Sequence, residues 1–91
     1  MTSITLKDHG DRLTADVEGH ELVIRYGWAG DRTMRVDFVG VPSALEGRGL
    51  GTQLVGALVE KVRRDGVRLH PVCSFARTKL ERHREWHDVL A

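Results

Sequence analysis

Residues 41–62, VPSALEGRGLGTQLVGALVEKV, decide the expected fold, because alternating glycines stand directly before a helical apolar pattern. The glycines are Gly47, Gly49 and Gly51. A glycine inside a helix or strand costs about 0.5 to 1 kcal/mol relative to alanine, so three at alternate positions indicate a backbone that takes an unusual path or is approached closely. The stretch therefore predicts a tight loop that leads into a helix.

The helix after this loop is indicated by apolar residues that recur with a helical period. They fall at i, i+4, i+7, i+8 and i+12, and are Leu50, Leu54, Ala57, Leu58 and Val62. Arg63 and Arg64 suit the negative end of a helix dipole, and Asp65-Gly66 is the expected end of the helix. We therefore expect a helix that begins near Gly49 and buries one stripe.

Four segments before the helix have the composition of β-strands. They lie around Ile4 and Leu6, at Leu13 to Val17, at Leu22 to Tyr26, and at about Thr33 to Val41. The expected turns between them are at residues 9–11, 18–20 and 27–31. Gly40 is a candidate bulge. This spacing predicts an antiparallel meander.

After the helix, Val67, Leu69 and Val72 suggest a fifth strand, and a second, basic helix is expected from Ser74. The order is then ββββαβα. A crossover through a helix returns to the same sheet in a parallel direction, so the fourth and fifth strands should be parallel. The fold class expected is α/β (α+β), with a mixed sheet.

Composition limits the possible functions. The chain has 91 residues and a net charge of +1, which fits one domain over residues 1–91 and argues against a nucleic-acid partner. Cys73 is the single cysteine, which excludes an internal disulfide and favours a cytoplasmic location. No apolar run has the length of a membrane span, so no membrane partner is expected.

The glycine loop has two interpretations. The loop opens at the carboxyl end of a strand and at a helix start, where backbone N–H groups and the helix dipole attract anions, so it can hold a phosphate or pyrophosphate. Arg48 could add a charged contact. Alternatively, the glycines only make a tight turn onto a closely packed helix. The pattern GxxxxGK[ST] is absent because no Lys-Ser or Lys-Thr follows these glycines. The pattern GxGxxG is absent because Thr52 stands three residues after Gly49.

The same residues resemble the GNAT superfamily of N-acetyltransferases, whose loop pattern is Arg/Gln-x-x-Gly-x-Gly/Ala. Glu46 to Gly51 matches it at Gly49 and Gly51. The chain from Val41 onward is similar to the minimal single-domain branch, which continues with a strand, a Pro-x-Cys-Ser/Pro-Phe/Tyr segment and a final helix that ends in an aromatic residue. Those residues here are Pro71, Cys73, Ser74, Phe75 and Trp86. The resemblance implies a GNAT-like fold with a βαβ unit that binds acetyl-CoA.

The resemblance also implies an activity and a site. The activity is transfer of acetyl from acetyl-CoA to an unidentified amine, by direct attack in a ternary complex, in a monomer or weak dimer. The implied cofactor-binding residues are Val41, Glu46, Gly47, Arg48, Gly49, Leu50, Gly51, Thr52, Ser74 and Phe75, and the implied catalytic residue is Cys73. A backbone N–H near residues 39–41 is expected to stabilise the oxyanion.

Two departures from the family pattern support an alternative. Glu46 replaces the usual Arg or Gln, and Phe38-Val39 replaces a His-Thr pair found in relatives. The alternative is a non-catalytic CoA or acyl-CoA binder, or an interaction module that kept the fold.

Several side chains have both a functional and a structural interpretation. Cys73 either takes part in acetyl or proton transfer beside the thioester, or is a small buried residue at a strand end. His70 is a candidate base or a solvated side chain, and Lys79 is either a contact to CoA phosphates or part of a solvated helix face. His83 and His87 have i,i+4 spacing, but HExxH is absent and no metal site is expected.

Overall fold

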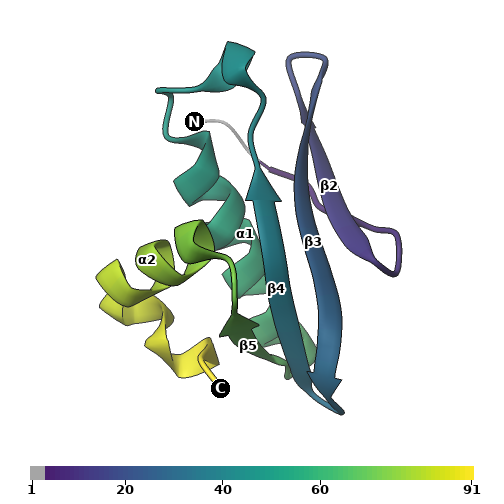
Figure 1. Cartoon of the computed structure of the whole chain (residues 1–91), viewed down its shortest axis with the longest axis vertical. Helices are drawn as coiled ribbons and strands as arrows, with labels where there is room; N and C mark the ends of the chain where they lie inside the picture. Colours follow the sequence, from purple (N-terminus) through teal and green to yellow (C-terminus); the bar gives the residue numbers. More distant parts are fainter. Residues whose placement is uncertain (1–3) are drawn as a thin grey trace.

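The computed structural model describes residues 4–91, and these form one five-stranded sheet with two α-helices packed on one face (Figure 1). The elements are β1 (Lys7–Asp8), β2 (Arg12–Val17), β3 (His20–Gly30), β4 (Thr33–Gly40), η1 (Ser43–Leu45), α1 (Leu50–Asp65), β5 (Arg68–Pro71), α2 (Ser74–Arg82) and η2 (Arg84–Val89). The strands lie side by side in sequence order. The predicted order ββββαβα and the mixed sheet are thus confirmed.

The direction of the strands follows from their connections. β1 to β4 pair antiparallel through short turns, whereas β4 and β5 pair parallel because α1 carries the chain back across the sheet. The predicted parallel pair is therefore confirmed. Within residues 4–91, no helix combines the length and the apolar character that crossing a membrane requires.

The core lies between the sheet and the two helices. The predicted stripe of α1 supplies Leu50, Leu54, Leu58 and Val62, all at most 3% exposed. The strands add their inward side chains, and α2 adds Ala76 and Leu80. Burying a Leu or Val side chain fully contributes about 1.5 to 3 kcal/mol, so this shared core holds the helices on the sheet.

The turn expected at residues 27–31 is wrong. β3 continues through it, with Gly27 opposite Arg35 and Trp28 opposite Met34, and only Asp31 and Arg32 connect β3 to β4. At Gly27 the Arg35 guanidinium of the facing strand occupies the space that a Cβ atom would take. Here glycine marks a close approach in a strand rather than a turn.

The bulge expected at Gly40 is also misplaced. Arg25 faces Phe38 and Tyr26 faces Val36, so the extra residue of β4 is Asp37. Because one inserted residue exchanges the two faces of a strand, Val36 and Val39 both pack toward the core while Phe38 is 48% exposed. Gly40 instead gives room to the Phe38 ring.

The two ends of the chain differ from expectation as well. Ile4 and Leu6 pack against the core but precede the short strand β1. The final helix stops at Arg82, because His83 has extended backbone angles, and Trp86 lies in the separate 3₁₀ helix η2. Trp86 packs there against α1, where a Cβ atom at Gly56 would lie 3.2 Å from its ring.

Candidate functional site

The glycine loop begins α1 with two residues in the left-handed region. Gly47 has φ 79° and Gly49, the N-cap of α1, has φ 73°. Other L-amino acids rarely adopt this conformation, which explains the glycines at both positions. The first turn of α1 contains no acidic residue. Its first N–H groups have no partner in the preceding turn, as at any helix start, so they attract anions.

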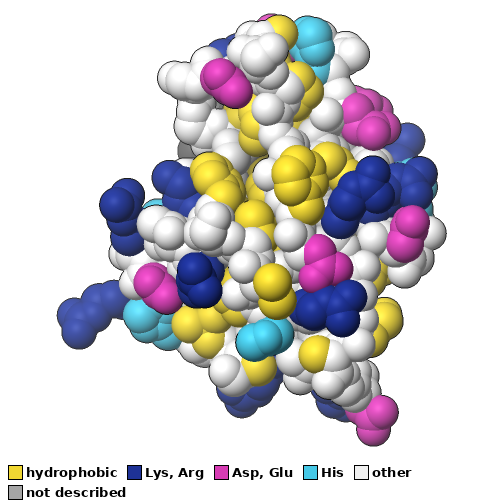
Figure 2. Space-filling model, viewed as in Figure 1, with side chains coloured by type: hydrophobic (Ala, Val, Ile, Leu, Met, Phe, Trp, Pro, Cys, Tyr) yellow, Lys and Arg dark blue, Asp and Glu magenta, His cyan; other side chains and the backbone are white. Residues whose placement is uncertain are grey.

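A hollow of about 200 Å³ lies between this loop, the end of β4 and α2. Its lining residues are Val41, Leu45, Glu46, Gly47, Gly49, Leu50, Gly51, Thr52, Phe75 and Lys79. Figure 2 shows hydrophobic side chains gathered over the carboxyl end of β4 and the start of α2 on this side of the molecule. All the residues expected from the sequence to bind the cofactor line the hollow except Arg48 and Ser74.

Phe75 and Lys79 form the α2 side of the hollow. A Cβ atom at Gly51 would lie 2.5 Å from Cζ of Phe75, so the ring lies directly against the first turn of α1. The Lys79 ammonium lies 5.5 Å from the centre of that ring, within reach of a cation–π contact. Lys79 thus brings a positive charge to the same hollow as the helix start. From the sequence it was only one of several cations on a basic helix.

Arg48 lies in the loop but is engaged elsewhere. Its guanidinium donates a hydrogen bond to the carboxylate of Glu18, in the turn between β2 and β3. This hydrogen bond and the opposite charge lower the pKa of Glu18 and raise that of Arg48. Because these residues are 30 positions apart in the sequence, sequence spacing gave no sign of the pair.

Cys73 lies where β4 and β5 separate. The N–H groups of Val72 and Cys73 both donate to the Val36 carbonyl at 3.0 Å, and Cys73 is the N-cap of α2. β5 pairs with β4 only up to Val36, so residues 37–40 have no strand partner on that edge within the described chain. The cysteine is half-buried and packs against the core, and its side chain makes no capping hydrogen bond.

The histidines have other environments. His70 lies in β5 opposite Arg35 and is exposed beside the buried Leu69, as expected for a solvated side chain. His83 stacks on Trp86 at 4.1 Å and bonds to the Lys79 carbonyl, and His87 bonds to the Glu81 carbonyl. Across residues 4–91, no cluster of three or more His, Cys, Asp or Glu is placed to hold a metal ion.

Comparison with known proteins identifies the family. A family model described as GCN5-related N-acetyl-transferase matches residues 12–89. The chain belongs to this family. The match begins with β2 and extends through the glycine loop, Cys73 and Trp86, so it includes every candidate site residue.

A solved structure similar to this GCN5-related chain comes from Staphylococcus aureus. It is the NMR solution structure of a GCN5-like protein, with 28% sequence identity and a TM-score of 0.76. The similarity covers 100% of this chain and 91% of that one. The GNAT fold expected from the resemblance is therefore shown. No curated protein sequence matches the chain.

Proposed function

We propose that this GCN5-related chain binds acetyl-CoA in the hollow beside the glycine loop and transfers its acetyl group to an amine. One observation carries the proposal: the positive-φ glycines place the start of α1 at the wall of a hollow that Lys79 also lines. The N–H groups of α1 and the Lys79 ammonium supply positive charge to a pyrophosphate, and the apolar wall supplies contacts to the rest of the molecule.

The free edge of β4 fits the remaining part of such a ligand. An extended chain with amide groups can pair with an unpartnered strand edge, and residues 37–40 lead from the glycine loop toward Val36 and Cys73. A ligand anchored by its phosphates at Gly49 and extended along this edge would place its thioester near Cys73. We therefore keep Cys73 as the candidate catalytic residue.

The proposed chemistry is direct transfer in a ternary complex. A neutral amine attacks the thioester carbonyl, the acetyl group moves to nitrogen, and CoA leaves as the thiol. The chain contributes by positioning the two reactants, by a backbone N–H near residues 39–41 for the negative oxygen, and by Cys73 as the group that moves a proton.

Thermal unfolding with added CoA or acetyl-CoA tests the binding part. A ligand at about 100 times its Kd stabilises the native state by about 2.7 kcal/mol, so the melting temperature should rise. Gly49→Glu should abolish this rise, because it places bulk and negative charge where the phosphates bind. Gly10→Glu is the matched control, since Gly10 also has a positive φ, 91°, but lies in a distant turn. A normal rise in melting temperature with CoA in Gly49→Glu would mean that the glycine loop is only a turn and does not bind the phosphates.

Acetyl transfer to a panel of amines tests the enzymatic part. Release of free CoA that depends on an added amine supports a transferase. Glu46 at the loop and Phe38-Val39 in β4 favour one alternative, a chain that binds CoA without turnover. A rise in melting temperature with no transfer to any amine would support that binding module instead.

A further inference from the structure

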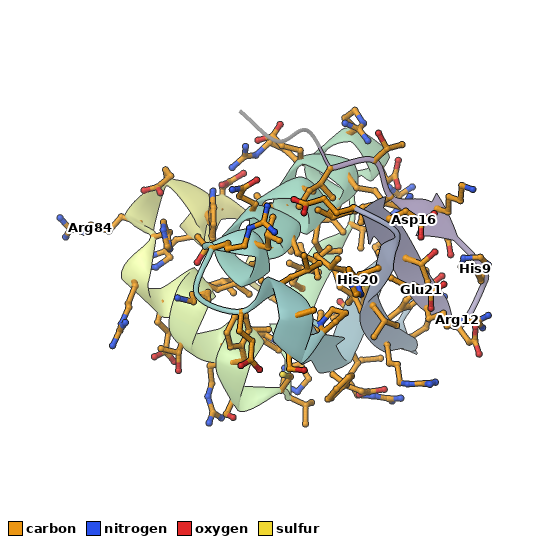
Figure 3. All side chains as sticks on the ribbon, turned by 90° about the horizontal axis from the view of Figure 1, so that it is seen from above. His9, Arg12, Asp16, His20, Glu21 and Arg84 are labelled. Atoms are coloured by element: carbon orange, nitrogen blue, oxygen red, sulfur yellow. The ribbon has the colours of Figure 1, made fainter. Side chains whose placement is uncertain are left out.

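The face of the sheet away from the helices carries segregated charges. On β2 and β3 the register places Arg12 opposite Arg25 at one end and Asp16 opposite Glu21 at the other. Figure 3 shows Arg12, Asp16 and Glu21 projecting from these strands on the side away from the helices. Like charges directly opposite each other destabilise a sheet, so this pattern opposes the stability of the single chain. We call these two strands' outward side chains the uncovered face.

These charges find few partners inside the chain. Arg12 bonds at 2.8 Å to its neighbour Asp11, in an exposed pair that contributes little to stability. Arg25, Asp16 and Glu21 are exposed and take part in none of the ion pairs formed within residues 4–91. The uncovered face therefore has a basic end and an acidic end, each largely uncompensated.

We propose that the uncovered face binds the same face of a second copy of the chain in a symmetric dimer. The twofold axis lies in the plane between the two faces, perpendicular to the strands and at the level of Thr14 and Val23. It brings the basic end of each copy onto the acidic end of the other. Arg12 and Arg25 then face the partner's Asp16 and Glu21, and the reverse contact follows from symmetry. The two ends lie four residues apart, about 14 Å at 3.4 Å per residue.

The centre of the face suits this arrangement. Thr14 and Val23 form an uncharged pair between the two ends. Thr14 is only 6% exposed, and its hydroxyl is hydrogen-bonded to the His9 ring at 2.7 Å. Lys7, opposite Thr14 at the sheet edge, is exposed, so its ammonium can stay in water. Both helices lie on the other face, so they do not obstruct the second copy.

Such a dimer is weak and sensitive to salt. Charges give an interface its specificity and rate of association more than its affinity, and the desolvation of ion pairs offsets much of their attraction. Sedimentation equilibrium should give a mass above the 10.2 kDa of one chain at about 0.01 M ionic strength. It should return to 10.2 kDa at about 1 M, where the Debye length falls to about 3 Å.

Two charge-reversal variants give a sharper test. Arg12→Glu/Arg25→Glu makes the uncovered face entirely acidic, and Asp16→Lys/Glu21→Lys makes it entirely basic. Each variant alone should sediment as a monomer at low salt, because like faces repel. An equimolar mixture should regain dimer mass, since every contact in the mixed pair joins opposite charges. Circular dichroism establishes that both variants are folded.

The control changes the same charge elsewhere. Arg77→Glu/Arg84→Glu alters two exposed arginines, one in α2 and one in η2. Figure 3 shows Arg84 on the opposite side of the molecule from the labelled residues of β2 and β3. This variant should self-associate like the natural chain. A monomeric mass for the natural chain at all salt concentrations, a mixture that stays monomeric, or a dimer that persists in the single-sign variants would each overturn the proposal.

Discussion

Gly51 and Phe75 lie in direct contact, each as the second residue of its helix, and their contact joins α1 to α2 at the hollow. Gly51→Ala would gain helix propensity of about 1 kcal/mol, but its Cβ would meet the ring at 2.5 Å. Because Phe75 is 39% exposed, the ring can move and the fold should persist. The moved ring changes the hollow, and we expect roughly tenfold weaker CoA binding by calorimetry, about 1.4 kcal/mol.

A double-mutant cycle separates this steric effect from others. In the Phe75→Ala background, Gly51→Ala should stabilise the fold, because the helix gains propensity and nothing blocks the new methyl group. Gly56→Ala is the control, since Gly56 lies in the same helix but faces Trp86, away from the hollow. Equal CoA affinity in Gly51→Ala and the natural chain would place the ligand elsewhere.

Cys73 allows capping and chemistry to be separated with two substitutions. As the N-cap of α2 it makes no side-chain bond, and serine at an N-cap contributes about 1 kcal/mol relative to alanine. Cys73→Ser should therefore unfold at a higher temperature than Cys73→Ala. If the thiol moves a proton, both variants should bind CoA but lose about 10²-fold in transfer rate. Transfer at the natural rate in both variants would make Cys73 a packing residue.

The element order could be predicted from the sequence because it depends on local patterns. The helical stripe from Leu50 to Val62 and the alternation from Leu13 to Val17 are patterns of residues that lie close together in the sequence. The glycine loop was located for the same reason, since left-handed backbone at Gly47 and Gly49 requires residues without a Cβ atom.

What the sequence did not reveal depends on contacts between distant residues. Gly27 resembles a turn residue until Arg35, eight positions later, is seen to cover it. The bulge at Asp37 comes from the pairing of two strands and has no glycine to mark it. Arg48 was expected to contact phosphate, and its bond to Glu18 requires knowing that the β2–β3 turn reaches the glycine loop.

Tyr26 should titrate far above the usual tyrosine range. Burial and a 2.6 Å hydrogen bond donated to Asp8 raise the pKa of Tyr26 to about 12. The pKa of tyrosine in the unfolded chain is 10, so the stability that this raised pKa contributes is fully present below pH 10. It is lost as pH rises through about 12, the pKa of Tyr26 in the folded chain. Tyr26 is the only tyrosine, so the ultraviolet absorbance of the phenolate reports it directly.

Substitutions of two nearby carboxylates assign the cause of this shift. Asp8→Asn should lower the pKa of Tyr26 partway toward 10, because the charge is lost while burial remains. Asp11→Asn should change it less, since Asp11 acts only through a weaker charge interaction. An equal effect of the two variants would contradict the role given to the Asp8 hydrogen bond.

Arg25→Glu should have opposite effects on the single chain and on its association. Residue 25 faces Arg12, so the substitution replaces a repulsive cross-strand pair with an attractive one. The exchange should raise the free energy of unfolding by about 0.2 to 1 kcal/mol. Chemical denaturation at low protein concentration should show this gain. Sedimentation at low salt should show weaker dimerisation. A loss of monomer stability would mean that Arg25 makes a contact more favourable than its repulsion with Arg12.

Glu18→Asn tests the tie between the β2–β3 turn and the glycine loop. Glu18 has φ 51°, and with Gly19 at φ 79° it forms a two-residue turn of the kind that favours Asn-Gly. Asparagine adopts left-handed backbone more readily than glutamate, so the melting temperature should rise although the ion pair with Arg48 is lost.

The freed Arg48 guanidinium can then turn toward a phosphate at Gly49, and we expect CoA binding to become a few-fold tighter by calorimetry. Arg48→Gln in the same background should remove that gain. Unchanged CoA affinity in Glu18→Asn would mean that Arg48 stays out of the hollow even when it is free to enter.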